Sequence, residues 1–157
     1  SFTMIASKFY KMRLSQLERA IEPFNTIKNA AVRPGGWLRA IRESLGRSLK
    51  TQAEIAGVSS GTLTKSERSE AEDRISLAQL RKLAAALDCE LVYGLVPKKP
   101  LHEVIQDRAE FMAKQEILGV AHSMSLEDQR PSDAFIERQI DERRRELLDG
   151  SWARLWQ

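Results

Sequence analysis

Apolar and polar positions alternate with a helical period in the N-terminal part of the chain. Between residues 8 and 24 the apolar side chains recur every three or four positions, which predicts an amphipathic helix. Pro23 is expected to end this helix, because proline lacks the amide hydrogen that a helix interior uses. We therefore expect a helical arm over residues 4–34, with Met4 as the native start. Its apolar stripe is Tyr10, Leu14, Leu17 and Ile21.

Four short helices are expected between residues 35 and 97. The first follows a Gly-Gly pair and is expected to stop at Gly46, since glycine often follows the last turn of a helix. The fourth is expected to begin at Ser76, which has capping-box spacing to Gln79. The predicted stripe of the first helix is Trp37, Leu38, Ile41 and Leu45, and that of the fourth is Leu77, Leu80, Leu83, Ala84 and Leu87.

The two middle helices are joined by a tight turn. Ser48 can cap the first helix and Ser59 the second, because a serine hydroxyl accepts a hydrogen bond from an amide of the first turn. Gly57 supplies the positive φ that the turn requires. Ala53 is small where two helices must cross closely, and Leu63 is expected to face the core. These residues predict a helix-turn-helix.

A short strand and two further helices are expected in the rest of the chain. The apolar run with β-branched residues near 90–96 favours a strand. Its partner is either a second copy of the chain or, more commonly, a surface on the arm. Residues 98–157 carry a wide apolar arc, followed by a helix that begins after Pro131 and Ser132. The first arc comprises Leu101, Val104, Ile105, Phe111, Met112, Leu118, Val120 and Met124, and the last stripe comprises Phe135, Ile136, Ile140 and Leu147.

Composition excludes several classes of protein. Cys89 is the only cysteine and the chain has two histidines, so neither an internal disulfide nor a zinc site is expected, and no cofactor is predicted. No apolar run reaches the roughly 18 residues that cross a bilayer, and no signal-peptide pattern is present. We expect a soluble, cytoplasmic protein without a membrane partner. No catalytic motif is found, so we expect no enzyme.

Charge is distributed unevenly along the chain. Residues 1–82 contain 15 Lys and Arg against 8 Asp and Glu, whereas residues 101–157 contain 8 against 12. A basic front half suits a polyanion such as DNA, and an acidic rear half suits a protein partner. Solvated helix faces would explain either half by itself.

The spacing of Ala53, Gly57, Leu63 and Glu67 resembles the helix-turn-helix of lambda-repressor-like (XRE-type) regulators. In that family the second helix enters the major groove of double-stranded DNA. The resemblance implies a mainly all-α fold, although Gln52 and Ser66 stand where the family usually has aliphatic residues. A structural αα-hairpin is the alternative. We predict that Ser60, Gly61, Thr64 and Lys65 face the base edges, and that Arg47, Lys50, Ser59, Thr62 and Arg68 reach phosphates.

A wider resemblance covers most of residues 4–156. "RPGGWLRAIRESLG", "SERSEAEDRISLAQLRKLAAALDCELVYGLVP" and "ARLW" look like the mobile mystery protein A family. Its members are bacterial, and their genes lie beside one for a Fic-domain protein. The resemblance implies an antitoxin-like transcriptional regulator with a Fic-domain partner. Some Fic domains are silenced by a helix with Ser or Thr four residues before Glu; here the nearest match is Ser66 to Glu70.

The predicted organisation is an arm at 4–34, a DNA-binding domain at 35–97 and a dimerisation or partner-binding region at 98–157. A homodimer would double the phosphate contacts and match two half-sites. Packing of the C-terminal helices within one chain is the alternative to dimerisation. A protein-binding module that neutralises its partner without binding DNA is the alternative function.

Overall fold

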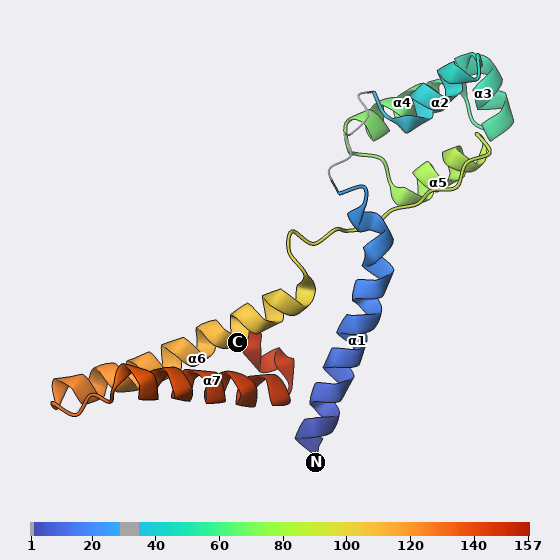
Figure 1. Ribbon diagram of the computed structural model, residues 1–157. Helices are drawn as coiled ribbons and strands as arrows, with labels where there is room; N and C mark the ends of the chain where they lie inside the picture. Colours follow the sequence, from blue (N-terminus) through green and yellow to red (C-terminus); the bar gives the residue numbers. More distant parts are fainter. Residues whose placement is uncertain (1, 29–34) are drawn as a thin grey trace. The chain divides into compact units, whose positions relative to one another are not determined.

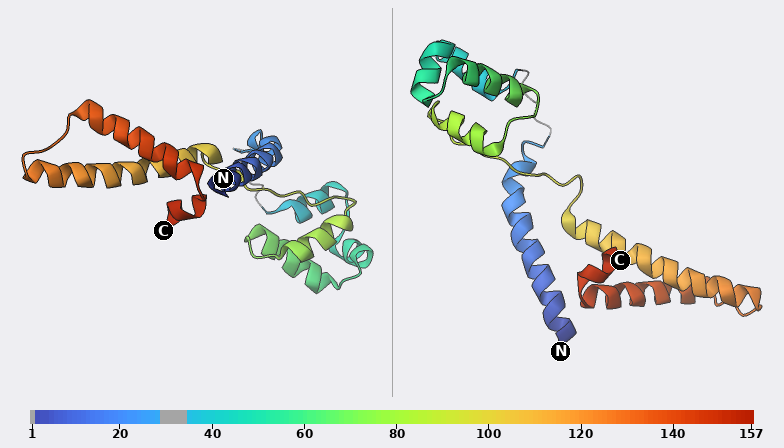
Figure 2. Two further views of the ribbon diagram at one scale, coloured as in Figure 1. Left: turned by 90° about the horizontal axis from the view of Figure 1, so that it is seen from below. Right: turned by 180° about the vertical axis from the view of Figure 1, so that it is seen from behind.

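The computed structural model describes residues 2–28 and 35–157 and divides the chain into two compact units. One unit comprises residues 27–94, and the other comprises residues 1–26 together with 95–157. We call them the helix-turn-helix unit and the hairpin unit. Within the helix-turn-helix unit four short helices surround one core (Figure 1). In the hairpin unit two long helices lie side by side (Figure 2).

The helix-turn-helix unit contains α2 (Trp37–Ser44), α3 (Leu49–Ala56), α4 (Ser60–Ala71) and α5 (Leu77–Ala85). Each helix contributes at least one apolar side chain to a shared core, so the short elements are stabilised mainly by packing against one another. The fully buried members of this core are Leu38, Ala53, Leu63, Leu83 and Leu87, and its half-buried neighbours include Ile41, Leu49, Val58, Ile75 and Leu80.

The predicted helix ends in this unit are confirmed. The hydroxyls of Ser48, Ser59 and Ser76 each accept a hydrogen bond from an amide of the first turn that follows, at 3.0–3.1 Å. Gly46 and Gly57 both have φ of 70°, the left-handed conformation that glycine adopts without steric cost. The sequence therefore fixes these boundaries through local chemistry.

Part of the predicted apolar stripes is wrong. Trp37, Leu45 and Leu77 are exposed, by 58%, 53% and 46% respectively. Helices of eight or nine residues make little more than two turns, so neighbouring apolar positions cannot all face the core. Ile55 of α3 is also exposed.

The strand expected near 90–96 does not form. Residues 90–97 have no regular secondary structure, and Val92, Tyr93 and Leu95 are exposed. A strand requires a hydrogen-bonded neighbour, and within the described residues no other segment pairs with this one. Residues 90–97 have the composition of a strand but no partner to pair with, so they form an irregular connection.

The hairpin unit contains α1 (Phe2–Asn25), α6 (Leu101–Leu126), α7 (Asp133–Asp149) and the 3-10 helix η1 (Trp152–Trp156). Pro23 lies inside α1 and does not end it, contrary to expectation. Because Pro23 is in the last turn it removes only one helical hydrogen bond, and the hydroxyl of Thr26 donates to its carbonyl at 2.9 Å. The predicted start of the last helix after Pro131 and Ser132 is confirmed, and the Ser132 hydroxyl caps α7.

Helices α6 and α7 run antiparallel and pack closely along small side chains. The residues of α6 that are buried are Ala109, Ala113 and Ala121, and we call them the alanine seam. Large apolar residues of the predicted arc point elsewhere: Phe111 and Leu118 are about half exposed. Alanine lets two helix backbones approach, which favours these small residues over Phe111 and Leu118 at the most closely packed positions. The core is completed by Leu147, Leu148, Trp152 and Leu155.

Helix α1 joins this core through one aromatic pair. The Tyr10 ring stacks on Trp152 with centroids 5.4 Å apart, and the Ser7 hydroxyl donates to the carbonyl of Leu148 at 3.1 Å. Tyr10 and Leu14 of the predicted stripe pack against the core, whereas Leu17 is half exposed. The apolar stripe predicted for the arm therefore identifies the buried side of α1 as far as Leu14.

Candidate nucleic-acid interface

Helix α4 begins at a turn whose geometry is set by three residues. Gly57 takes the left-handed conformation, and the amide of Val58 donates to the carbonyl of Ala53 at 3.0 Å. The side chain of Ser59 then caps α4. This turn fixes the start of α4 relative to α3, as a helix-turn-helix requires.

One face of α4 is exposed along its length. The four residues predicted to face base edges, Ser60, Gly61, Thr64 and Lys65, are all exposed. The opposite face is buried at Leu63, Ser66 and Glu67. Small side chains on the exposed face let a partner approach the backbone closely, while hydroxyls and an ammonium offer hydrogen bonds to base edges.

Four of the residues predicted to reach phosphates are also exposed, namely Lys50, Ser59, Thr62 and Arg68. Ser59 and Thr62 are joined through their hydroxyls at 2.9 Å, and the Thr62 amide donates to Ser59. These two residues therefore stabilise the first turn of α4. The amides there carry the positive end of the helix dipole, which favours a nearby phosphate.

Arg47, the fifth predicted phosphate contact, is engaged inside the unit. Its guanidinium donates to the Gln52 side chain at 3.0 Å and to the carbonyl of Ala86 at 3.4 Å. The amide group of Gln52 donates to the same carbonyl at 2.9 Å. Arg47 is half buried, so its observed contacts brace the end of α5 against α3. The buried Gln52 is satisfied by these bonds.

A buried ion pair that the sequence did not reveal holds the inner face of α4. Arg42 donates from Nε and Nη2 to the two carboxylate oxygens of Glu67, at 2.7 and 3.0 Å, and its Nη1 donates to the carbonyl of Arg47 at 2.9 Å. Hydrogen bonding to Glu67 raises the pKa of Arg42 above its usual value. The available signal was an arginine four residues after Leu38, on the face that carries the core.

The far end of α4 holds the start of α2. The carboxylate of Glu70 accepts hydrogen bonds from the backbone amides of Trp37 and Leu38, both at 2.7 Å. A carboxylate at a helix N-terminus satisfies amides that have no partner within the helix. Glu67 and Glu70 together fasten the back of α4 to α2, which leaves its opposite face for recognition.

The structure offers no arrangement for metal binding in its described part: no three His, Cys, Asp or Glu side chains gather there. Among the described helices none is both long and apolar enough to span a membrane.

Comparison with family models places a helix-turn-helix domain at residues 38–93. The matched range includes α3, the turn at Gly57 and all of α4. Searches against curated proteins and solved structures gave no match. With the helices described above, the match confirms the expected all-α, lambda-repressor-like fold and indicates a DNA-binding regulator.

Proposed function

On the premise that residues 38–93 are a helix-turn-helix domain, we propose that this protein is a sequence-specific transcriptional regulator. It binds a palindromic operator as a dimer and represents the antitoxin-like partner of a Fic-domain protein. The observation that carries the DNA-binding part is the exposed face of α4, backed by Leu63 and the Arg42–Glu67 pair. The proposal assigns no catalytic residue to the chain.

DNA binding is tested by titrating a fluorescent duplex from the upstream region of the protein's own gene. A scrambled duplex and a second salt concentration separate specific from electrostatic binding. Lys65→Ala should cost about 1–3 kcal/mol on the cognate duplex and relax one base position, whereas Arg68→Ala should weaken all duplexes alike. Lys82→Ala is the matched control, because Lys82 is exposed on α5. If both variants lost the same affinity for the cognate and the scrambled duplex, Lys65 would not read a base and the two residues would not differ in role.

Dimerisation is supported by apolar side chains that α6 leaves uncovered. Phe111, Leu118 and Val120 are exposed by 49%, 45% and 60%, whereas Ile105 and Met112 pack within the hairpin unit. Sedimentation should give a dimer at micromolar concentration, and Leu118→Glu should convert it to monomer. A monomer that stays monomeric on DNA argues against this part of the proposal.

The partnership with a Fic-domain protein rests on the sequence resemblance. Ser66 is buried and Glu70 holds the amides of α2, so this stretch could reach an active site only if α4 detached from the core. We therefore expect inhibition to use another surface. Glu70→Gln should leave inhibition of AMP transfer by the Fic-domain protein of the adjacent gene unchanged. Failure of duplex binding at low salt, with inhibition intact, would favour a protein-binding module.

A further inference from the structure

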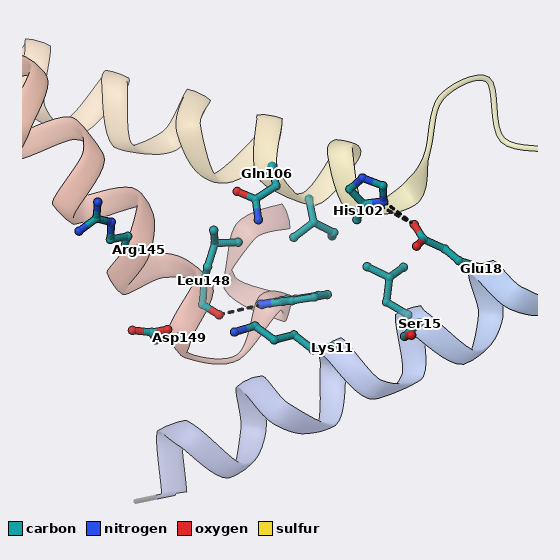
Figure 3. A pocket seen from close by; sticks show the side chains of 11 residues that line it. Lys11, Ser15, Glu18, His102, Gln106, Arg145, Leu148 and Asp149 are labelled. Carbon is teal, nitrogen blue, oxygen red and sulfur yellow. Dashed lines mark hydrogen bonds and ion pairs between the residues drawn. The ribbon is translucent and has the colours of Figure 1, made fainter.

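A cavity of 430 Å³ lies in the hairpin unit between α1, α6 and α7 (Figure 3). Its apolar lining consists of Leu14 from α1, Ile105 from α6, Leu148 from α7 and Trp152 from η1. Sites for small molecules commonly measure about 300–1,000 Å³ and combine an apolar lining with a few polar groups. The polar lining residues are Lys11, Ser15, Glu18, His102, Gln106, Arg145 and Asp149.

The floor of this cavity is held in place before any ligand binds. The indole of Trp152 stacks on Tyr10 and donates from Nε1 to the carbonyl of Leu148 at 3.0 Å. Leu148 itself is 8% exposed. A fixed aromatic floor spares a ligand the cost of ordering it, which favours binding.

Two nitrogen donors, Lys11 and Gln106, line the cavity from opposite walls. The Lys11 ammonium has no ion pair within the described residues. The carbonyl oxygen of Gln106 accepts from Arg144 at 3.0 Å, which leaves the NH₂ group of Gln106 available. Arg145 is not a third donor, because its side chain pairs with Asp141 through Nη2 at 2.6 Å, is 71% exposed and lies apart from Lys11 and Gln106 in Figure 3. Figure 3 shows Arg145 and Asp149 at the end away from His102, with Lys11 and Gln106 reaching in from opposite walls.

The carboxylates of the cavity differ in how far they are engaged. Glu18 accepts from the backbone amide of His102 at 2.9 Å and contacts its Nδ1 at 3.0 Å. Asp149 lines the cavity, and its carboxylate has no hydrogen bond or ion pair within the described residues. The lining thus offers one cation, Lys11, and one neutral donor, Gln106, together with the unpaired carboxylate of Asp149.

We propose that the cavity binds a small organic carboxylate with an apolar body. The carboxylate takes the charge-assisted hydrogen bond of Lys11 and a hydrogen bond from the NH₂ group of Gln106. The hydrocarbon part lies on Trp152 between Leu14 and Ile105, removed from water. Asp149 limits the affinity through repulsion.

The first experiment uses 2-naphthoate as the probe on the full chain without DNA. Of the three tryptophans, Trp152 lines the cavity and Trp37 belongs to the other unit. Titration should shift the indole N–H signal of Trp152 in ¹⁵N-correlated NMR spectra and leave that of Trp37 in place, with Kd of about 1 mM or below. 2-Naphthamide, which has the same shape without the charge, should bind about tenfold more weakly.

Charge substitutions test the orientation of the carboxylate. Lys11→Gln should raise Kd for 2-naphthoate about tenfold. Asp149→Asn should lower it about two- to fivefold, because a repulsive charge is removed. Lys8→Gln is the matched control, since Lys8 is exposed on the same helix and does not line the cavity. Weaker binding by Asp149→Asn would overturn the proposed carboxylate site.

Steric substitutions test the location. Ser15 is exposed at the rim, so Ser15→Phe should fill the cavity and abolish the Trp152 shift without disturbing the core. Gln16→Phe, at an exposed neighbouring position outside the lining, should leave binding unchanged. Absence of any Trp152 shift at ~10 mM probe overturns the proposal. A second outcome would also overturn the proposal: the unsubstituted chain binds no probe and forms a dimer that Ser15→Phe dissociates. The cavity would then be occupied by a second copy of the chain.

Discussion

The helices of the helix-turn-helix unit span 8 to 12 residues, whereas α1, α6 and α7 of the hairpin unit span 17 to 26. A short helix leaves most of its backbone amides and carbonyls near an end, where they lack helical partners. The first unit meets this need with serine caps and the Glu70 carboxylate. The second has a serine cap at α7 but depends mainly on side-chain packing along α6 and α7.

The contrast extends to the cores. In the helix-turn-helix unit the buried leucines adjoin a bidentate Arg42–Glu67 pair. In the hairpin unit the alanine seam and the Tyr10–Trp152 stack bring the helices together. Directed polar contacts fix a unique orientation but tolerate the loss of a partner poorly. Close packing of small residues tolerates polar changes at its edges but not added volume.

The largest expected effect comes from Arg42→Met. This change leaves the Glu67 carboxylate buried without its partner, and we expect a loss of about 3–5 kcal/mol in the free energy of unfolding. Urea unfolding followed by the indole N–H signal of Trp37 in NMR spectra measures this loss in the helix-turn-helix unit, because Trp152 and Trp156 belong to the hairpin unit. Arg39→Met is the control, because Arg39 pairs with Glu43 on the exposed surface and should matter little. The double variant Arg42→Met/Glu67→Leu should recover most of the loss; no recovery would mean that the pair is not the cause.

Ala113→Leu probes the packing of the other unit. Ala113 is fully buried against α7, so the added volume should cost about 1–3 kcal/mol by forcing the helices apart. Thermal unfolding monitored by circular dichroism gives the value. Gln115→Leu makes a comparable change at an exposed position of α6 and should leave stability unchanged. Equal losses in the two variants would show that the seam is not closely packed.

Serine caps occur in both units and allow a direct comparison. Ser59→Ala removes the cap of α4 and Ser132→Ala that of α7. Each should cost about 1 kcal/mol. Hydrogen exchange should localise each effect to the first turn of its helix. Faster exchange throughout either unit would contradict a purely local role.

The smallest expected effect is a pH dependence of the stability of the hairpin unit. Hydrogen bonding by the His102 backbone amide, and then by its ring, lowers the pKa of Glu18 from 4.5. The stability that Glu18 contributes is therefore present above pH 4.5 and disappears as the pH falls through its lower folded value. The free energy of unfolding is measured for the native chain and for Glu18→Gln, at neutral pH and at pH values below 4.5. The difference between the two chains should become smaller as the pH falls. If the difference in free energy of unfolding did not change with pH, the contact between Glu18 and His102 would not be the source of this stability.

Local features of the fold were predictable from the sequence. Ser48, Gly57, Ser59 and Ser76 act on amides within a few residues, so their type and spacing carry the information. The exposure of the residues assigned to base reading followed from the same pattern. Their contacts with DNA, and the proposed domain boundaries, remain predictions.

Features that depend on distant partners were not predicted. Arg42 meets Glu67 across 25 positions of sequence, and Arg47 turns inward because Gln52 and the Ala86 carbonyl accept from it. Hydrophobicity favours large residues as the buried side of α6, whereas close helix packing selects the alanine seam. The segment near 90–96 has strand propensity but finds no partner among the described residues.

The Glu70 contact has a consequence for how this chain can vary over evolution. Gly36 precedes α2 with φ of 82°, and a Cβ built on it would lie 2.8 Å from the Glu70 carboxylate. A side chain at position 36 would therefore push the Glu70 carboxylate away from the two amides that it holds, and it would require a strained backbone. Substitutions at these two positions, 34 residues apart, should arise as a correlated pair among descendants of the same ancestor.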